Sequence, residues 1–345
     1  MPPAVRPVHR VAALAGALAL VGLAVAARTA PVAARPGVLV REERAMMGSR
    51  VAVAVWVGAA EHAQATAAVA AALDDLASWE ARVSEWQPGS DVDRVNAAAG
   101  GGPVAIGEDA RALIVAARRW AERTDGVFDP TGGPLFALWE QARSRGTLPA
   151  AAAVEAARRL VDWRAIEVAA GGVRLRRPGM RLGLGALGKG VAAERASANL
   201  SAAGFGDHLV DCGGDLAVSG RRDGAPWQVA LRSSDDRIVA IAGLTAGTIA
   251  TSGDGVRGFE VDGVRYGHIL DLRTGWPARG VRSVTVFAPR DADPLATALF
   301  VLGPEGGDAL LAGIPDAWAV WSDERGAVVT SRRVRIRAGQ IEVAP

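Results

Sequence analysis

The pattern of apolar and polar residues predicts a mainly helical first half and a β-rich second half. Residues 38–57 have the composition of strand, with a break at residues 47–48. Apolar residues then recur at helical spacing over residues 59–86 and 108–123, and helical segments continue to about residue 160. The first half is therefore expected to contain few strands beyond its start.

From Ile166 onward, short β-rich runs alternate with glycine turns such as Gly213-Gly214. Helices interrupt this pattern only near residues 191–200 and 294–302. The chain shows neither an internal repeat nor a disordered linker after its N-terminal segment. We therefore predict a single α+β unit that spans residues 37–345.

The first 36 residues have the order of a secretory signal followed by a flexible leader. Arg6 and Arg10 precede an apolar run at residues 11–27, which is short for a membrane-spanning helix. The only cysteine, Cys212, lies far from this segment, so no cysteine is placed for lipid attachment after the signal. We expect export to the periplasm or cell envelope, with tethering if the signal stays uncleaved.

Charge and composition draw attention to one residue. The formal net charge is +2 and both signs are interspersed, so nucleic acid is not an expected partner. Of 39 Lys and Arg residues, only Lys189 is a lysine, and it lies in the glycine-rich run LGLGALGKG before an expected helix. A helix start favours an anion such as phosphate, and a compact ammonium differs from a guanidinium. The alternative to an anion-binding role is that a single lysine remains by chance in a chain that otherwise uses arginine.

A second candidate is the segment Asp293-Pro-Leu-Ala-Thr297, which precedes an apolar helix. Asp293 suits the N-cap of that helix, with proline in its first turn. Alternatively, Asp293 and Thr297 lie about one turn apart and present two oxygens to a hard cation such as Mg²⁺.

Three further side chains each allow two interpretations. His268, in RYGHILDLRTGWP, is either a general base beside Asp271 or a strand histidine bonded to backbone. Asp129, in FDPTGG, either binds a ligand or caps a turn. Trp86 either stacks on a flat heterocycle or belongs to the core.

In their order along the chain, six segments resemble the ApbE family of FAD:protein FMN transferases. They are MGS at Met47, SEWQPGSDVDRVN, FDPTGGPL, LGLGALGKG, RYGHILDLRTGWP and ADPLATALFVLG, and the resemblance runs to Gly303. It implies a T-fold-like core within the α+β fold, FAD as substrate and Mg²⁺ as metal. It also implies an acceptor flavoprotein, which the expected export would make an exported or membrane-bound protein.

The resemblance also implies roles for individual residues. Around the flavin nucleotide it places Met47, Trp86, Val127, Phe128, Asp129, Lys189 and Ile269. At the metal it places Asp293, Thr297 and the backbone carbonyl of Ala186. The expected catalytic residues are His268, Asp271 and Lys189.

Four positions depart from the pattern that the resemblance implies. Gly183 stands where aspartate is common, Trp86 and Val191 where tyrosine is frequent, and Leu272 where proline usually follows the aspartate.

The expected reaction is transfer of FMN from FAD to a Ser or Thr hydroxyl of the acceptor, with release of AMP. The alternatives are hydrolysis of FAD to FMN and AMP, and an exported flavin-binding protein without turnover.

Overall fold

The computed structural model describes residues 37–233, 235–255 and 258–344 of the 345-residue chain. The expected signal and leader at residues 1–36 lie outside the described residues. Within those ranges, no helix combines the length and the apolar character that crossing a bilayer requires.

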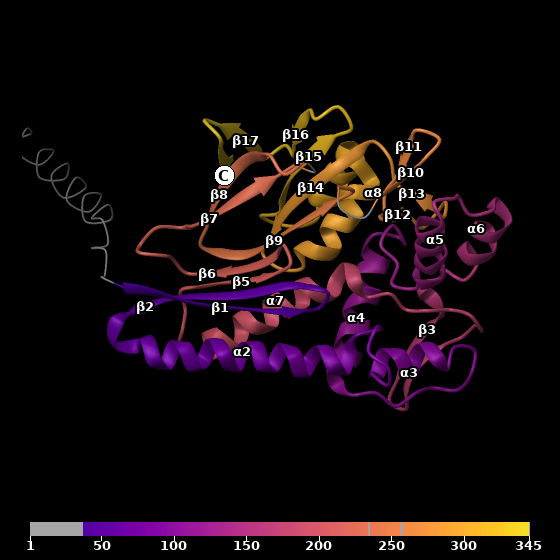
Figure 1. The fold of residues 1–345 in the computed structure, drawn as a ribbon, viewed down its shortest axis with the longest axis horizontal. Coiled ribbons are helices and arrows are strands. Elements are labelled where there is room, and N and C mark those ends of the chain that lie inside the picture. Colours follow the sequence, from indigo (N-terminus) through magenta and orange to yellow (C-terminus); the bar gives the residue numbers. More distant parts are fainter. Residues whose placement is uncertain (1–36, 234, 256–257, 345) are drawn as a thin grey trace, which may run out of the picture.

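An eight-stranded antiparallel sheet forms the centre of the fold (Figure 1). Its strands in spatial order are β1 (Gly37–Met46), β2 (Ser49–Gly58), β5 (His208–Cys212), β6 (Asp215–Ser219), β9 (Ala246–Gly253), β14 (Val281–Ala288), β15 (Trp318–Asp323) and β16 (Val328–Thr330). Strand β2 is nearly all apolar because both of its faces are covered: Val53 contributes to one core cluster and Ala54 to another.

Helices cover one face of this sheet and a smaller sheet covers the other. The helices are α2 (His62–Val83), α4 (Glu108–Arg123), α7 (Gly185–Ala202) and α8 (Ala292–Leu311). Their apolar residues, such as Leu73, Leu187 and Leu299, share the largest core cluster with β2 and β14. The smaller sheet has the order β17 (Val334–Arg337), β18 (Gln340–Val343), β8 (Ile238–Leu244) and β7 (Trp227–Arg232).

Short helices and hairpins gather at one end of the molecule (Figure 1). They are α3 (Asp91–Ala97), α5 (Gly133–Arg145), α6 (Ala151–Arg158), β3 (Ile166–Ala169), β4 (Gly172–Leu175), β10 (Phe259–Val261), β11 (Val264–Tyr266), β12 (Leu270–Asp271) and β13 (Trp276–Pro277), with a 3₁₀ turn at η2 (Trp163–Ala165). The other 3₁₀ turn, η1 (Ala59–Glu61), connects β2 to α2. Trp139 of α5 stacks on Tyr266 at 6.0 Å between ring centroids, and its indole N–H donates to the Gly275 carbonyl at 2.8 Å. This contact fastens the hairpins to α5.

The α+β prediction is confirmed, with helices mainly in the first half and strands mainly in the second. Helix α7 begins at Gly185 rather than near residue 191, because the Glu85 carboxylate accepts the Leu184 N–H at 3.1 Å and supports an earlier start. Helix α8 continues to Leu311 across a break at Gly303, where φ is 67° and ψ is −176°. The Glu85 contact could not be predicted from the local sequence, because Glu85 and Leu184 are 99 residues apart in the chain.

Candidate active site

The only lysine of the chain lies in the second turn of α7 and pairs with a buried carboxylate. The Lys189 ammonium forms an ion pair with Asp215, the first residue of β6, which is only 3% exposed. Asp215 follows the tight turn at Gly213-Gly214, whose residues have φ of 67° and 97°. Glycine suits this backbone, which carries Asp215 up to α7.

A second buried carboxylate shares the same ammonium. Burial raises the pKa of Asp215, and the nearby Asp293 carboxylate raises it further, whereas Lys189 opposes the rise. Burial likewise raises the pKa of Asp293. Burial would lower the pKa of Lys189, but the two carboxylates outweigh it and the net shift is upward. Two buried carboxylates thus repel each other across a single ammonium, and a cation bound beside Asp293 would relieve this repulsion.

Asp293 does not act as the N-cap of α8, so this alternative from the sequence is excluded. The N-cap is Asp291, with φ of 60°, and Asp293 lies within the first turn. Its carboxylate accepts the Gly190 N–H of α7 at 3.0 Å. A Cβ on Gly190 would lie 2.6 Å from the Asp293 Cβ, so glycine lets the two helices meet here.

The expected metal ligands adjoin this contact. Ala186 departs from helical geometry, with φ of −92° and ψ of 17°, which turns its carbonyl away from the direction it has in a regular helix. Thr297 is half-buried, one turn after Asp293. A carboxylate, a hydroxyl and a backbone carbonyl are oxygen donors of the kind that Mg²⁺ takes. Together with the repulsion between the two buried carboxylates, this donor set fits the predicted cation.

The described residues contain no group of three or more His, Cys, Asp and Glu side chains arranged around a common metal position. The expected site is of another kind, since Asp293 is the only one of its three members with such a side chain. The absence of a carboxylate or imidazole cluster therefore does not test it.

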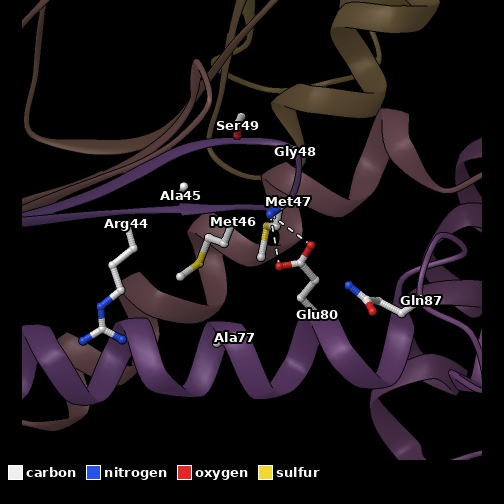
Figure 2. Close-up of a pocket in the computed structure, with 9 residues that line it drawn as sticks. All are labelled: Arg44, Ala45, Met46, Met47, Gly48, Ser49, Ala77, Glu80 and Gln87. Carbon is white, nitrogen blue, oxygen red and sulfur yellow. Dashed lines mark hydrogen bonds between the residues drawn. The ribbon is translucent and has the colours of Figure 1, made fainter.

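A pocket of about 600 Å³ lies at the turn between β1 and β2 (Figure 2). It is lined by Arg44, Ala45, Met46, Met47, Gly48, Ser49, Ala77, Glu80 and Gln87. Met47 has φ of 53°, and its N–H donates to both Glu80 carboxylate oxygens, at 2.9 and 3.0 Å. Figure 2 shows Glu80 reaching from α2 to the turn, so this carboxylate fixes Met47 in its left-handed conformation.

The register of the central sheet places the β1–β2 turn near Lys189. Val51 pairs with Cys212, and Cys212 pairs with Asp215. The Ser49 hydroxyl is buried and lacks a hydrogen-bond partner among the described residues. A Cβ built on Gly213 would lie 2.5 Å from the Ser49 hydroxyl oxygen. The same Cβ would lie 3.8 Å from Cδ of Lys189, so Gly213 separates the two side chains. A buried hydroxyl without a partner is costly, so Ser49 is suited to bond a polar ligand atom.

Trp86 is 78% exposed, which excludes the core alternative for this side chain. It follows Glu85, whose carboxylate holds the glycine-rich segment through the Leu184 N–H. Burial raises the pKa of Glu85, while the backbone N–H groups that it accepts oppose the rise. Trp86 is thereby placed next to the start of α7 with its ring in solvent.

Val127 and Phe128 are buried in the main core, and the Asp129 side chain has a structural role. Its Oδ1 accepts from the N–H and hydroxyl of Thr131 at 2.8 and 2.6 Å, and its Oδ2 accepts from the Trp163 N–H at 3.0 Å. The turn-capping alternative thus describes this carboxylate. A flavin contact by this segment stays a prediction that rests on the resemblance.

His268 is exposed on the segment between β11 and β12. Its neighbour Ile269 packs against the main core and accepts the Ala278 N–H at 2.9 Å. Asp271 accepts from Arg273 through Nε at 2.8 Å and Nη2 at 2.9 Å. Arg273 therefore engages both carboxylate oxygens of Asp271, and assistance of His268 by Asp271 stays a prediction.

Sequence reasoning missed Asp215, Ser49 and Glu85. A local pattern does not reveal them, because each acts on a segment distant in sequence. One signal was present for Asp215: a single lysine in a glycine-rich, apolar setting needs a carboxylate partner, and the sequence LVDCGGD offers two.

Comparison with known proteins gives consistent matches. The profile of the ApbE family matches residues 47–321. FAD:protein FMN transferase from Treponema pallidum is 35% identical over 270 residues, which cover 72% of this chain and 73% of that protein. The Rhodobacter capsulatus protein of the same name is 32% identical over 74% of this chain and 50% of its own length.

Solved structures agree with these matches. The crystal structure of the ApbE protein from Thermotoga maritima has a TM-score of 0.77 and 30% identity, and it covers 86% of this chain and 97% of that chain. The flavin transferase ApbE from Vibrio cholerae has a TM-score of 0.74 and 28% identity, covering 86% of this chain and 98% of its own.

Proposed function

Since this chain belongs to the ApbE family, we propose that it is a flavin transferase that moves FMN from FAD to an acceptor protein. The observation that carries the proposal is the meeting of α7 and α8, where the Lys189 ammonium is near enough to Asp293 for that carboxylate to raise its pKa, and where the Gly190 N–H bonds the Asp293 carboxylate. The non-helical Ala186 lies one turn before Gly190. An ammonium beside oxygen donors for a cation is what a pyrophosphate needs, because its oxygens carry negative charge.

The proposed reaction is nucleophilic substitution at the FMN phosphorus of FAD. A Ser or Thr hydroxyl oxygen of the acceptor forms a bond to this phosphorus, and the bond to the bridging oxygen breaks. AMP leaves with that oxygen, and the hydroxyl proton passes to His268, which is exposed and within reach of an incoming protein. The product is an acceptor that carries FMN through a phosphoester.

Lys189 stabilises charge on the pyrophosphate in this proposal. Its ammonium is held by Asp215 and its pKa stays raised, so the side chain is charged at neutral pH. A divalent cation held by Asp293, Thr297 and the Ala186 carbonyl would supply further positive charge to the leaving phosphate oxygens. The flavin nucleotide would lie against Met47, Trp86, residues 127–129 and Ile269.

Hydrolysis of FAD to FMN and AMP is a second candidate. The exposure of His268 favours it, because water reaches this imidazole as readily as a protein hydroxyl does. The two reactions share every step except the identity of the nucleophile.

Chromatography of AMP and FMN separates the candidates. The chain is incubated with FAD, with and without Mg²⁺ and with and without a candidate acceptor flavoprotein. Acceptor-dependent AMP release, with flavin retained on the acceptor, supports the transferase. AMP together with free FMN at the full rate of turnover indicates a pyrophosphatase, and FAD binding without AMP under any condition indicates a flavin-binding protein.

We also propose that the protein acts outside the cytoplasm, on an exported or membrane-bound acceptor. The support is the order of charged, apolar and small residues within the first 36 positions. Fractionation of cells that express the full chain tests this, since recovery in the cytoplasm would contradict it.

A further inference from the structure

Two exposed aromatic residues lie on elements that contact the same glycine-rich segment. Of all the aromatic residues in the described ranges, only Trp86 and Phe136 are exposed, at 78% and 37%. Trp86 follows Glu85, which bonds the Leu184 N–H, and Phe136 lies against Gly183. Single exposed apolar residues are ordinary on protein surfaces, but Phe136 contacts a segment of the candidate site, and its position there calls for an explanation.

Phe136 is held by close contact with two glycines. It lies in the first turn of α5, where its N–H donates to the Gly132 carbonyl at 3.0 Å. A Cβ on Gly132 would lie 2.6 Å from the ring atom Cζ, and a Cβ on Gly183 would lie 3.0 Å from Cδ2. The ring therefore rests against bare backbone on one side while part of it stays open to solvent. Such a ring is preorganised for a ligand.

The ring lies where three segments of the candidate site meet. Gly132 belongs to the FDPTGG loop, and Gly183 precedes Ala186 by three residues. The third segment is the β12–β13 hairpin, since Cδ1 of Leu272 lies 3.1 Å from the position of a Cβ on Gly132. The first two segments carry residues that the proposed function assigns to FAD or its transfer, and the hairpin directly follows His268 and Ile269.

We propose that Phe136 is a substrate-binding residue whose ring stacks on a flat heteroaromatic ring of FAD. This inference rests on the proposed function, because that function makes FAD the ligand. FAD contains two such rings, adenine and isoalloxazine, and stacking on a phenyl ring suits either. The backbone of Gly132 and Gly183 sets the position of the phenyl ring, so the ring does not have to be ordered when substrate binds.

Calorimetric titration of the full chain with FAD in the presence of Mg²⁺ tests the proposal. Phe136→Ala is expected to weaken FAD binding about tenfold, which corresponds to about 1.4 kcal/mol. Phe136→Tyr keeps the ring and is expected to bind like the wild type. Phe136→Leu keeps apolar volume without a π-face and is expected to bind nearly as weakly as Phe136→Ala. Leu148→Ala removes an apolar side chain of matched exposure, 38%, from the loop between α5 and α6, and it should leave affinity unchanged.

Titrations with FMN and with ADP identify the ring. A loss confined to FMN assigns the isoalloxazine, and a loss confined to ADP assigns the adenine. Unchanged FAD affinity in Phe136→Ala would overturn the proposal. So would wild-type affinity in Phe136→Leu, because the side chain would then only fill space. Thermal unfolding of each variant shows whether the fold is retained.

A double-mutant cycle gives an independent check. Gly183→Ala brings a Cβ to within 3.0–3.1 Å of the ring and should displace it, which weakens FAD binding in the wild-type background. In the Phe136→Ala background the same change should have little further effect. Equal losses in both backgrounds would show that Gly183 acts without Phe136.

These measurements separate the inference from the proposed function. Binding is measured without acceptor, so affinity that depends on Phe136 supports the inference even if FMN is never transferred. If FMN is transferred while the Phe136 variants bind like the wild type, the inference fails alone. In turnover, the inference predicts a raised KM with nearly unchanged kcat for Phe136→Ala. If the wild type does not bind FAD, both fail.

Discussion

One ammonium serves two buried carboxylates where α7 meets α8. Lys189 pairs directly with Asp215, and Asp293 raises the pKa of both Lys189 and Asp215. A guanidinium carries the same charge but is planar and larger. Gly213 lies close to the Lys189 stem, since a Cβ there would be 3.8 Å from Cδ, so the space around the stem is limited.

Lys189→Arg is therefore expected to lower kcat/KM for AMP release at least about tenfold, which is a loss of about 1.4 kcal/mol of transition-state stabilisation. Lys189→Met should also destabilise the fold by roughly 1–3 kcal/mol, since it leaves Asp215 buried without its partner. The measurements are initial rates of AMP release and urea unfolding. Wild-type rates in Lys189→Arg would show that any cation suffices here.

For single residues, the sequence indicates which side chains belong to the candidate site better than it indicates which residues they contact. The rarity of lysine and the glycine-rich setting drew attention to Lys189 before any fold was considered. Its partner Asp215 lies 26 positions away and is reached through strand pairing, which the local sequence does not encode. For Asp129 and Asp293 the sequence left two alternatives each. The structure shows the capping alternative for Asp129, which accepts from Thr131 and Trp163. For Asp293 it excludes the N-cap alternative, since Asp291 is the N-cap and Asp293 accepts the Gly190 N–H, while metal binding stays a prediction.

Helix α7 contains three glycines, which lower its intrinsic stability, and their surroundings differ. A Cβ on Gly190 would lie 2.6 Å from the Asp293 Cβ, whereas a Cβ on Gly188 would meet nothing within 4 Å. Glycine costs up to about 1 kcal/mol relative to alanine inside a helix. The close approach of α7 and α8 explains why Gly190 is needed, and no contact explains Gly188.

Two alanine substitutions test this account of α7. Gly188→Ala is expected to raise the free energy of unfolding by up to about 1 kcal/mol. Gly190→Ala should lower it by about 1–3 kcal/mol, because the new methyl group forces α7 away from α8. Urea unfolding measures both. Equal effects of the two changes would contradict the proposed helix contact.

His208 links α7 to β5 and makes this contact sensitive to pH. Its Nδ1 bonds the Phe205 carbonyl at 2.7 Å, so Nδ1 carries the proton, and Nε2 accepts from the Ser197 hydroxyl at 2.7 Å. Burial lowers the pKa of His208 below its usual value of about 6.5. The unfolded chain therefore binds the second imidazole proton, which makes His208 positively charged, more readily than the folded chain does.

It follows that His208 favours the folded state above about pH 6.5, and that this contribution is lost as pH falls towards the folded pKa. Urea unfolding at pH 7 and pH 5 should show a larger loss of stability for the wild type than for His208→Asn. Asparagine keeps a donor for the Phe205 carbonyl but does not titrate. Parallel losses in the two proteins would contradict a role for His208.

At the scale of the whole molecule, both halves of the chain contribute to the largest core cluster and to the candidate site. The largest core cluster joins Leu73 of α2 to Leu299 of α8, and the buried Ser49 hydroxyl lies beside the Gly213 turn that leads to Asp215. Apolar periodicity predicted most helices and the first two strands. It could not predict the strand order, because β9 lies between β6 and β14 through contacts that short, glycine-bounded strands do not encode.

Ligand binding should stabilise the whole molecule. With FAD and Mg²⁺ present, and free FAD at 100 times its dissociation constant, the free energy of unfolding should rise by about 2.7 kcal/mol. Asp293→Ala should remove the part of this rise that requires Mg²⁺, because it deletes a carboxylate expected to bind the cation. Thermal unfolding with and without a chelator measures the difference. A rise that survives in Asp293→Ala would place the cation elsewhere.

Intact-mass measurement of an acceptor flavoprotein tests the central claim most directly. After incubation with the wild-type chain, FAD and Mg²⁺, the acceptor should gain the mass of one FMN less one water at a Ser or Thr residue. Asp293→Ala and omission of Mg²⁺ should each abolish this gain. If AMP accumulates while the acceptor keeps its original mass, the chain hydrolyses FAD and does not transfer FMN.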